Sequence, residues 1–218
     1  MSLLHSALAA SYPALYLLQR FGHYTIYNRS KRLRVLLYHD IAPEEQKNFE
    51  RQLTWLSRRW TFISPEYFAA VINGEANIQN NSLLLTFDDG FASNQRVAEN
   101  ILKPMGIKAI FFVVSDLVDI EDHDEARQFI VKHVQPGTTI NNLPTCLSNM
   151  KWSGLENLLE QGHTIGCHTQ THARLSELSS SNGLADEIVS SADRLESRLG
   201  VHIEHFAYTF GDLASFSY

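Results

Sequence analysis

One stretch near the middle of the chain, residues 82–90, constrains the fold more than any other. It reads SLLLTFDDG, a short apolar run that ends in two aspartates and a glycine. A run of this kind, bounded by a turn signal, is typical of a buried strand. The carboxylates of Asp88 and Asp89 are costly at the end of such a strand unless a cation meets them, and Gly90 allows the chain to turn there. The stretch therefore predicts two carboxylates at one edge of a sheet, where active sites often lie in α/β folds.

The same residues also have a purely structural interpretation. Asp-Gly is a common turn pair, and an aspartate at the end of a strand often caps the following helix. On this stretch alone the structural and the functional interpretations are equally well supported. The decision between them depends on a second stretch further along the chain.

Strand and helix patterns alternate along most of the sequence. Besides the central strand, strands are expected at residues 34–39, 108–114, 163–167 and 203–210. Apolar residues at helical spacing, caps and turn signals predict helices between the strands, at residues 49–60, 64–73, 91–105, 153–160 and 184–199. This alternation predicts five parallel βα units in an α/β fold, as a barrel or as a doubly wound sheet.

Residues 116–150 interrupt the alternation. The segment is expected to be irregular and at best partly helical, and its length predicts an insertion on the surface or over a cleft. It contains a run of acidic residues that we expect to form a solvated face: Asp119, Glu121, Asp122, Asp124 and Glu125.

Composition narrows the classes of partner. With 218 residues the chain is long enough for one domain with a substantial core. Eighteen basic against twenty-four acidic residues give a net charge of −6, and no basic stripe is present, so no nucleic-acid partner is expected. Two cysteines do not form a disulfide framework. The sequence gives no oligomeric state.

The first thirty residues differ from the rest. Residues 3–21 are fairly apolar but too interrupted by polar residues for a membrane span, and they lack the basic start of a cleavable signal peptide. They predict an amphipathic helix that packs on the body or lies at a membrane surface. We therefore expect residues 1–30 to be a helix and connector, residues 31–218 to be the domain, and the protein to be cytoplasmic or membrane-associated rather than secreted.

The second decisive stretch is GCHTQTH, residues 166–172. His168 and His172 are four residues apart, so on a helical turn both imidazoles would share a face and could chelate one transition metal. A carboxylate would complete a three-ligand set, and an adjacent free carboxylate could act as a base, which is the division that metal-assisted hydrolysis requires. Two alternatives stay open: a chance pair among ten histidines, and an iron oxygenase with a similar ligand set.

The two stretches together resemble a known family. TFDDG at residues 86–90 and HTQTH at residues 168–172 resemble the first two motifs of the NodB-like polysaccharide deacetylases, carbohydrate esterase family 4. The flanking text LLYHDI, GIKAIFFVV and MKWSGLENLLEQG agrees, and the resemblance extends over residues 34–211. It implies a distorted (β/α) barrel and metal-dependent removal of N-acetyl groups from the amino sugars of a polysaccharide or glycoconjugate.

The resemblance also implies roles for particular residues. By motif position, Asp88 would be the catalytic base, and Asp89, His168 and His172 would be the metal ligands. The implied ion is zinc, with cobalt or nickel as alternatives, and a water molecule on the ion would be the nucleophile.

The third motif of the family matches only in part. Residues 206–211, FAYTFG, stand where the family usually has Arg-x-Pro-Tyr-Gly. Phe210 takes the aromatic place, whose backbone N–H would serve the oxyanion. Ala207 stands where arginine is usual, which leaves Asp88 without its usual partner, and Thr209 stands where proline is usual. Tyr208 is a candidate for a supporting role.

A second supporting pair follows the first expected strand. His39 and Asp40 are expected at the same edge of the sheet, where they could assist Asp88; alternatively, His39 is a packed strand-end residue.

The end of the chain departs further from the family. No match to its fourth and fifth motifs follows Gly211, and five units are fewer than its usual barrel contains, so we expect a barrel that is incomplete at the C-terminus. Truncation, completion by another subunit and a degenerate member are three explanations. The function hypotheses are accordingly an N-deacetylase, a member that binds metal and carbohydrate without turnover, and a hydrolase with a different acyl substrate.

Overall fold

The computed structural model describes residues 31–178, 180–212 and 215. The chain divides into two units, Met1–Arg32 and Leu33–Tyr218, and the second contains the sheet. The amphipathic helix expected over residues 3–21 lies outside the described residues. Within residues 31–178, 180–212 and 215, no helix is both long enough and apolar enough to cross a membrane.

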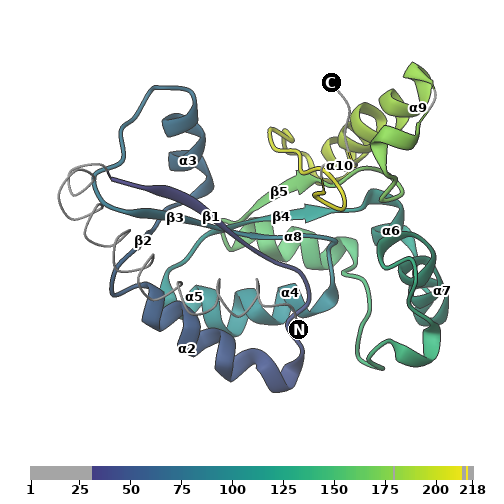
Figure 1. The fold of residues 1–218 in the computed structure, drawn as a ribbon, viewed down its shortest axis with the longest axis horizontal. Helices are drawn as coiled ribbons and strands as arrows, with labels where there is room; N and C mark the ends of the chain where they lie inside the picture. Colours follow the sequence, from purple (N-terminus) through teal and green to yellow (C-terminus); the bar gives the residue numbers. More distant parts are fainter. Residues whose placement is uncertain (1–30, 179, 213–214, 216–218) are drawn as a thin grey trace, which may run out of the picture. The chain divides into compact units, whose positions relative to one another are not determined.

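A parallel sheet forms the centre of the second unit (Figure 1). Its strands lie in the order β1 (Leu33–Tyr38), β3 (Ser82–Phe87), β4 (Ala109–Val113) and β5 (Thr164–Cys167), and β2 (Thr61–Phe62) pairs with the start of β3. All pairings are parallel. The predicted α/β class is confirmed. The described strands form an open sheet, so closure into a barrel stays a prediction.

Helices occupy the connections between the strands, close to the expected positions. Ser64 caps its helix as expected, because its hydroxyl accepts a hydrogen bond from the Tyr67 N–H at 3.3 Å. The expected helices at residues 91–105 and 184–199 each contain a π-helical turn between α-helical segments. The helical elements are η1 (Pro43–Glu45), α2 (Gln46–Leu56), α3 (Pro65–Ile72), α4 (Ala92–Val97), η2 (Ala98–Leu102), α5 (Lys103–Met105), α6 (Ser115–Asp119), α7 (His123–Phe129), η3 (Ile130–Val134), η4 (Ile140–Asn142), α8 (Trp152–Glu160), η5 (Leu175–Glu177), α9 (Ser181–Ala185), η6 (Asp186–Ser190) and α10 (Ser191–Leu199).

The two faces of the sheet are buried differently. On one face, Leu85 and Phe87 of β3 pack with Phe111 of β4 against the helices α2, α4 and α8 in the main core. On the other face, Leu84 and Ile110 belong to a small cluster beside α3. This alternation of side chains follows from strand geometry.

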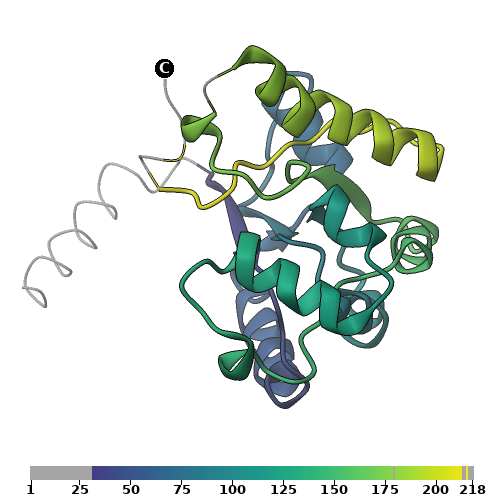
Figure 2. The ribbon, with the colours of Figure 1, turned by 90° about the vertical axis from the view of Figure 1, so that its right-hand side faces the viewer.

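The insertion between β4 and α8 is more ordered than the sequence predicts. It contains α6, α7, η3 and η4 around a core of its own, and Figure 2 shows α7 and η3 as one helical run below the run from α9 to α10. Arg127 is buried at its centre and donates to the carbonyls of Ile140 (3.1 Å) and Leu143 (3.2 Å). A side chain that satisfies loop carbonyls leaves no periodic pattern, which is why the sequence predicted an irregular segment. The five acidic residues are exposed, as expected.

The prediction of a strand over residues 203–210 is wrong, because the structure has a single β-bridge there. Only Phe206 forms a bridge with Cys167, flanked by bonds from Cys167 N–H to the His205 carbonyl (2.9 Å) and from Ala207 N–H to the Cys167 carbonyl (3.0 Å). Further along, Phe210 adopts a left-handed conformation with φ of 63°. This conformation is incompatible with a strand, so the segment leaves the sheet and turns toward the site.

Candidate active site

Strand register brings the two decisive stretches to one edge of the sheet. Phe87 pairs with Phe111, and Val113 pairs with Cys167, so β3, β4 and β5 end at nearly the same level. Backbone bonds extend this alignment beyond the strands: Asp88 N–H donates to the Tyr38 carbonyl at 2.9 Å, and His168 N–H donates to the Val113 carbonyl at 2.9 Å. The predicted meeting of the two stretches is confirmed.

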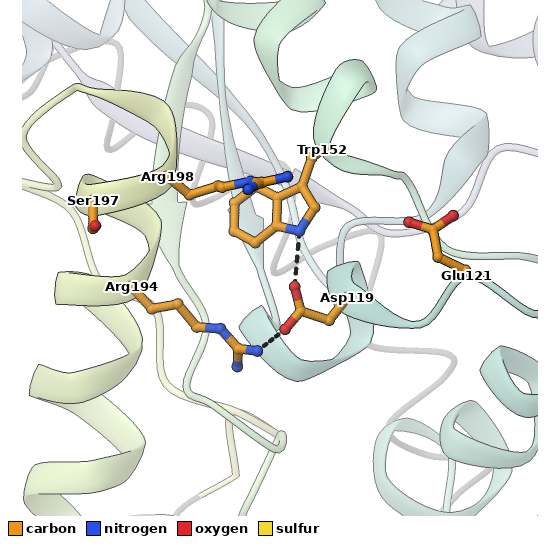
Figure 3. A pocket seen from close by; sticks show the side chains of 6 residues that line it. All are labelled: Asp119, Glu121, Trp152, Arg194, Ser197 and Arg198. Carbon is orange, nitrogen blue, oxygen red and sulfur yellow. Dashed lines mark hydrogen bonds and ion pairs between the residues drawn. The ribbon is translucent and has the colours of Figure 1, made fainter.

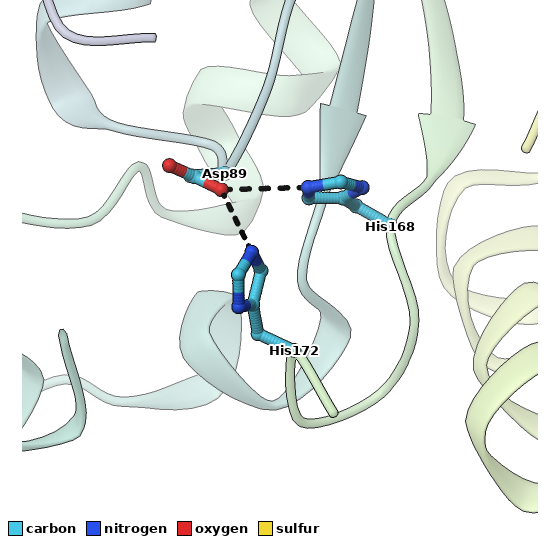
Figure 4. A group of neighbouring side chains, drawn as sticks. All are labelled: Asp89, His168 and His172. Atoms are coloured by element: carbon cyan, nitrogen blue, oxygen red, sulfur yellow. Dashed lines mark ion pairs between the residues drawn. The ribbon is translucent and has the colours of Figure 1, made fainter. Parts of the chain in front are cut away.

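A strained turn aims the Asp89 carboxylate. Asp89 has φ of 74° and Gly90 has φ of 75°, so two successive residues are left-handed. For a residue other than glycine this costs about 1–2 kcal/mol. Met150 N–H fixes the turn by donating to the Gly90 carbonyl at 2.8 Å. The side chain of Asp89 consequently points at the histidine loop (Figure 4).

The two histidines converge, although the predicted reason was wrong. Residues 168–172 form an irregular loop rather than a helical turn, with Thr169 at φ of 67° and His172 at φ of 62°. The loop folds back on itself and places the two imidazole centroids 5.1 Å apart. The spacing of His168 and His172 therefore predicted that the two imidazoles lie close together. It could not predict the loop, because the left-handed residues Thr169 and His172 are not glycines.

Asp89, His168 and His172 form a buried cluster of potential ligands (Figure 4). Asp89 Oδ1 lies 3.5 Å from His168 Nε2 and 3.4 Å from His172 Nε2. Each imidazole is oriented through its other nitrogen: His168 Nδ1 bonds the Ala207 carbonyl (2.9 Å) and His172 Nδ1 bonds the His133 carbonyl (3.0 Å). Such bonds leave the Nε2 lone pairs free to face a common centre.

These separations fit a shared ion better than direct hydrogen bonds. Charge-assisted N–H···O bonds have lengths of about 2.7–2.9 Å, shorter than either distance here. A tetrahedral ion bound at about 2.0–2.2 Å holds its ligand atoms about 3.3–3.6 Å apart. Two imidazoles and a carboxylate are also a ligand set of catalytic zinc sites. The residues present therefore fit a divalent transition metal.

Asp88 has different electrostatics from its neighbour. Burial raises the pKa of the Asp88 carboxyl to about 6, the imidazole of His168 opposes the shift, and the Asp89 carboxylate adds to it. Burial alone would also raise the pKa of Asp89, but the two imidazoles outweigh it and hold that pKa below its usual range. Among the described residues, Asp88 Oδ1 has no hydrogen-bond partner. One carboxylate thus suits a ligand, and the other suits a base near neutral pH.

A cavity of about 440 Å³ opens onto this cluster. His39 is exposed and lines it, so the alternative of a packed strand-end residue is wrong. Tyr208 and Phe210 form part of its wall, and Asp40 is not among the described residues that line it. The lining residues are Leu37, His39, Asp88, Asp89, Val134, Gln135, His168, His172, Tyr208, Phe210 and Gly211.

Comparison with known proteins identifies the family. The sequence profile described as polysaccharide deacetylase matches residues 76–216, more than half of the chain. The chain belongs to the polysaccharide deacetylase family. Among curated proteins, it is 26% identical over 98 residues to "Putative polysaccharide deacetylase YxkH" of Bacillus subtilis (strain 168), a match that covers 42% of this chain and 35% of YxkH. The chain therefore matches about a third of the length of that relative.

Solved structures share the fold. IcaB from Ammonifex degensii superposes with a TM-score of 0.65 at 23% identity, over 85% of this chain and 78% of IcaB. The Streptococcus pyogenes deacetylase PplD, solved in complex with acetate, has a TM-score of 0.60 at 23% identity, over 84% of this chain and 77% of PplD. At this identity the likeness establishes the fold.

The third motif, residues 206–211, contacts both the histidine loop and the apolar cluster on the second face of the sheet. The backbone carbonyl of Ala207 orients His168, but its side chain packs beside the apolar cluster of Leu84 and Ile110 rather than reaching Asp88. Thr209 Oγ1 donates to the Ala173 carbonyl at 2.6 Å, which joins this segment to the end of the histidine loop. The unpartnered Oδ1 of Asp88 agrees with the predicted effect of the missing arginine.

Phe210 contacts the cluster from the third motif. Its ring centroid lies 4.7 Å from that of His172, and the guanidinium of Arg174 lies 4.4 Å from the same ring. Arg174 in turn pairs with Asp212 at 2.9 Å. These contacts place Phe210 beside the imidazole of His172, at the position where the family resemblance implies an aromatic residue.

Sequence reasoning missed one group that supports the site. Glu187 is buried and accepts three hydrogen bonds from the histidine loop. A signal for it exists: Glu187 and Ser191 stand at helical spacing with Leu195, so two polar residues lie on the inward face of an otherwise apolar stripe.

A second cavity, of about 550 Å³, lies on the outer face among α6, α8 and α10 (Figure 3). Three of its charged side chains contact other residues of its lining. Asp119 accepts from Trp152 Nε1 at 2.8 Å and pairs with Arg194, and the guanidinium of Arg198 lies 5.6 Å from the Trp152 ring centroid. The cluster of potential metal ligands found in the described chain, Asp89, His168 and His172, lies in the other cavity.

Proposed function

We propose that the protein is a metal-dependent hydrolase that removes N-acetyl groups from the amino sugars of a polysaccharide or glycoconjugate. The observation that carries the proposal is the convergence of Asp89, His168 and His172: Asp89 Oδ1 lies 3.4–3.5 Å from the Nε2 atom of each histidine, and the three potential ligand atoms all lie within 4.8 Å of one another. These three residues would hold the ion, with zinc as the first choice and cobalt or nickel as alternatives. When bound, a divalent ion supplies polarisation of the acetyl carbonyl and a water molecule of lowered pKa.

Asp88 acts as the base in this proposal. Its unpartnered Oδ1 accepts a proton from the water that attacks the amide carbon, and a pKa of about 6 leaves the carboxylate mostly ionised at neutral pH. Breaking the C–N bond then yields acetate and an amine, and the leaving nitrogen requires a proton. Among the described cavity residues, protonated Asp88 and His39 are candidates to supply it.

Phe210 and Tyr208 complete the proposed site. The backbone N–H of Phe210 would stabilise the negative charge that develops on the acetyl oxygen, as donors in an oxyanion hole do. Tyr208 is 54% exposed on the cavity wall, where an aromatic ring can pack against a sugar. The cavity has both polar and apolar walls, and its volume of about 440 Å³ suits one residue of a longer glycan chain.

The alternative function is a member that binds metal and carbohydrate without turnover. The observation in its favour is Ala207, which leaves Asp88 without the partner that the family's arginine provides. This alternative predicts the same metal affinity and no release of acetate.

Acetate release from N-acetylglucosamine oligomers tests the proposal. The chain is stripped of metal, supplied with zinc or cobalt, and compared with Asp88→Asn and Asp89→Asn. We expect metal-dependent release, a loss of about 10²–10⁴-fold in Asp88→Asn with zinc still bound, and loss of both release and zinc in Asp89→Asn. Zinc binding without any acetate release would reject an N-acetylglucosamine deacetylase and favour the binding protein or a hydrolase with a different acyl substrate.

A further inference from the structure

The loop that carries both histidines is held in an unfavourable conformation. Thr169 and His172 have positive φ values of 67° and 62°. Each such residue costs about 1–3 kcal/mol and persists only where the surroundings determine it. Contacts outside the loop must therefore stabilise it.

Glu187, in the π-helical turn η6, contacts the loop on one side. Its Oε2 accepts hydrogen bonds from Gln170 N–H at 3.0 Å and from Thr171 N–H at 2.9 Å. Its Oε1 accepts from the hydroxyl of Thr171 at 2.6 Å. One side chain thus satisfies three donors from two successive residues between the histidines.

The start of α6 contacts the loop on the other side. Ser115 N–H donates to the Thr169 carbonyl at 3.3 Å, and Asp116 N–H donates to the Gln170 carbonyl at 3.0 Å. The loop therefore has its carbonyls bound by α6 and its N–H groups bound by Glu187. From α6, Asp116 adds one long side-chain contact, since its Oδ2 accepts from Gln170 Nε2 at 3.4 Å. Glu187 is the side chain that binds backbone N–H groups of Gln170 and Thr171, so the backbone conformation of the loop depends on it most directly.

Glu187 also depends on the loop, because of its buried environment. The residue is 8% exposed and forms no ion pair with a lysine or arginine in the described chain. A buried carboxylate is costly unless it is hydrogen-bonded. Its three donors all come from the histidine loop, so the carboxylate is satisfied only when the loop adopts this conformation.

We propose that Glu187 is a positioning residue, which holds the His168–His172 loop in the conformation that directs both imidazoles at one point. The inference rests on the proposed function in one respect, namely that the point between the two imidazoles is a metal site. The ordering of the loop itself does not require a metal.

Backbone amide hydrogen exchange of the metal-free full chain tests the ordering. In Glu187→Ala we expect the amides of Gln170 and Thr171 to exchange at least tenfold faster, because they lose their acceptor. Ser191→Ala is the matched control: Ser191 is buried on the same helical face, but it contacts Cys167 and Ser115 instead of the loop amides. It should leave those two amides protected.

Zinc affinity, measured by competition with a chromogenic chelator, tests the consequence. Outer contacts to metal ligands typically change affinity by about 10–100-fold, and we expect a loss in this range for Glu187→Ala. Glu187→Gln should retain part of the affinity, since its amide oxygen can still accept from both N–H groups. Thr171→Val removes one of the three hydrogen bonds to Glu187, and Thr171→Ser is its control because it keeps the hydroxyl. This pair of variants provides the test if Glu187→Ala does not fold.

Two results would overturn the proposal. One is unchanged amide exchange and zinc affinity in folded Glu187→Ala. The other is an equal loss in Ser191→Ala, which would indicate general packing instead of positioning. If the wild-type chain binds no zinc, the proposed function fails, and amide exchange alone decides whether Glu187 orders the loop.

Discussion

Asp88 and Asp89 are neighbours with the same side chain, and the fold gives them opposite chemistry. The left-handed φ of 74° turns Asp89 toward two imidazoles, while Asp88 stays buried with Oδ1 unpartnered. Pairs of carboxyls whose pKa values are driven apart commonly divide the roles of acid and base. The sequence could predict that the roles would be divided. Which aspartate takes which role was implied only by the family resemblance. The left-handed conformation of Asp89, which orients the two side chains differently, cannot be predicted from the residue types.

Restoring a cation at position 207 should change the pH dependence of the reaction. The side chains of Ala207 and Asp88 line the same groove, so in Ala207→Arg we expect the guanidinium to favour the ionised carboxylate and lower the pKa of Asp88. Because the base must be ionised, activity in the wild type should fall as the pH decreases through about 6, and in the variant this fall should move to lower pH.

The measurement is the pH profile of kcat/KM for acetate release. Ala207→Met is the control, because it adds a side chain of similar length without charge. An acidic limb that stays near pH 6 in Ala207→Arg, or that moves equally in Ala207→Met, would argue against Asp88 as the titrating base.

At the scale of elements, sequence predicted the regular parts and missed the irregular ones. The strand of residues 82–87 was predicted from its apolar run, and it is a buried strand in the structure. The helix that follows Ser64 was predicted from its cap, and the structure contains that cap. The insertion and the segment after Phe206 are organised by carbonyls, a buried arginine and left-handed residues. Those interactions join residues far apart in the chain, so no local pattern records them.

The turn after β3, at Asp89 and Gly90, allows a test of whether the turn determines the direction of the Asp89 side chain. Gly90 has φ of 75°, and a Cβ there would lie 3.0 Å from Val113 Cγ1. Gly74, after α3, has a similar φ of 77° with nothing within 4 Å of an added Cβ. Both Gly→Ala changes incur backbone strain of about 1–2 kcal/mol, and only Gly90→Ala adds overpacking of about 1–3 kcal/mol.

Urea denaturation and zinc titration of the two variants distinguish these effects. We expect the free energy of unfolding to fall further in Gly90→Ala than in Gly74→Ala, and zinc affinity to fall in Gly90→Ala alone, because the turn carries Asp89. Equal destabilisation with equal zinc affinity would mean that the turn relaxes freely and does not determine where Asp89 points.

At the scale of the whole molecule, the sheet has one face covered by helices and one face that carries a groove of about 350 Å³ beside Asp88. Apolar side chains of β1 reach this groove, with Val35 at 53% and Leu37 at 48% exposure. The alternation of strands and helices was sufficient to predict a parallel α/β fold. It could not predict which face would be covered, because apolar residues occur on both sides of β3 and β4.

Two leucines on adjacent strands measure the difference between these faces. Leu85 is fully buried in the main core, and Leu37 is about half exposed on the groove side. Leu85→Ala should lower the free energy of unfolding by about 2–5 kcal/mol. Leu37→Ala removes the same atoms from a position that is already partly solvated, so we expect a loss below about 1 kcal/mol. Urea denaturation of both variants decides the matter: a comparable loss in Leu37→Ala would mean that the groove face is covered in solution, because only buried apolar atoms contribute stabilisation of that size.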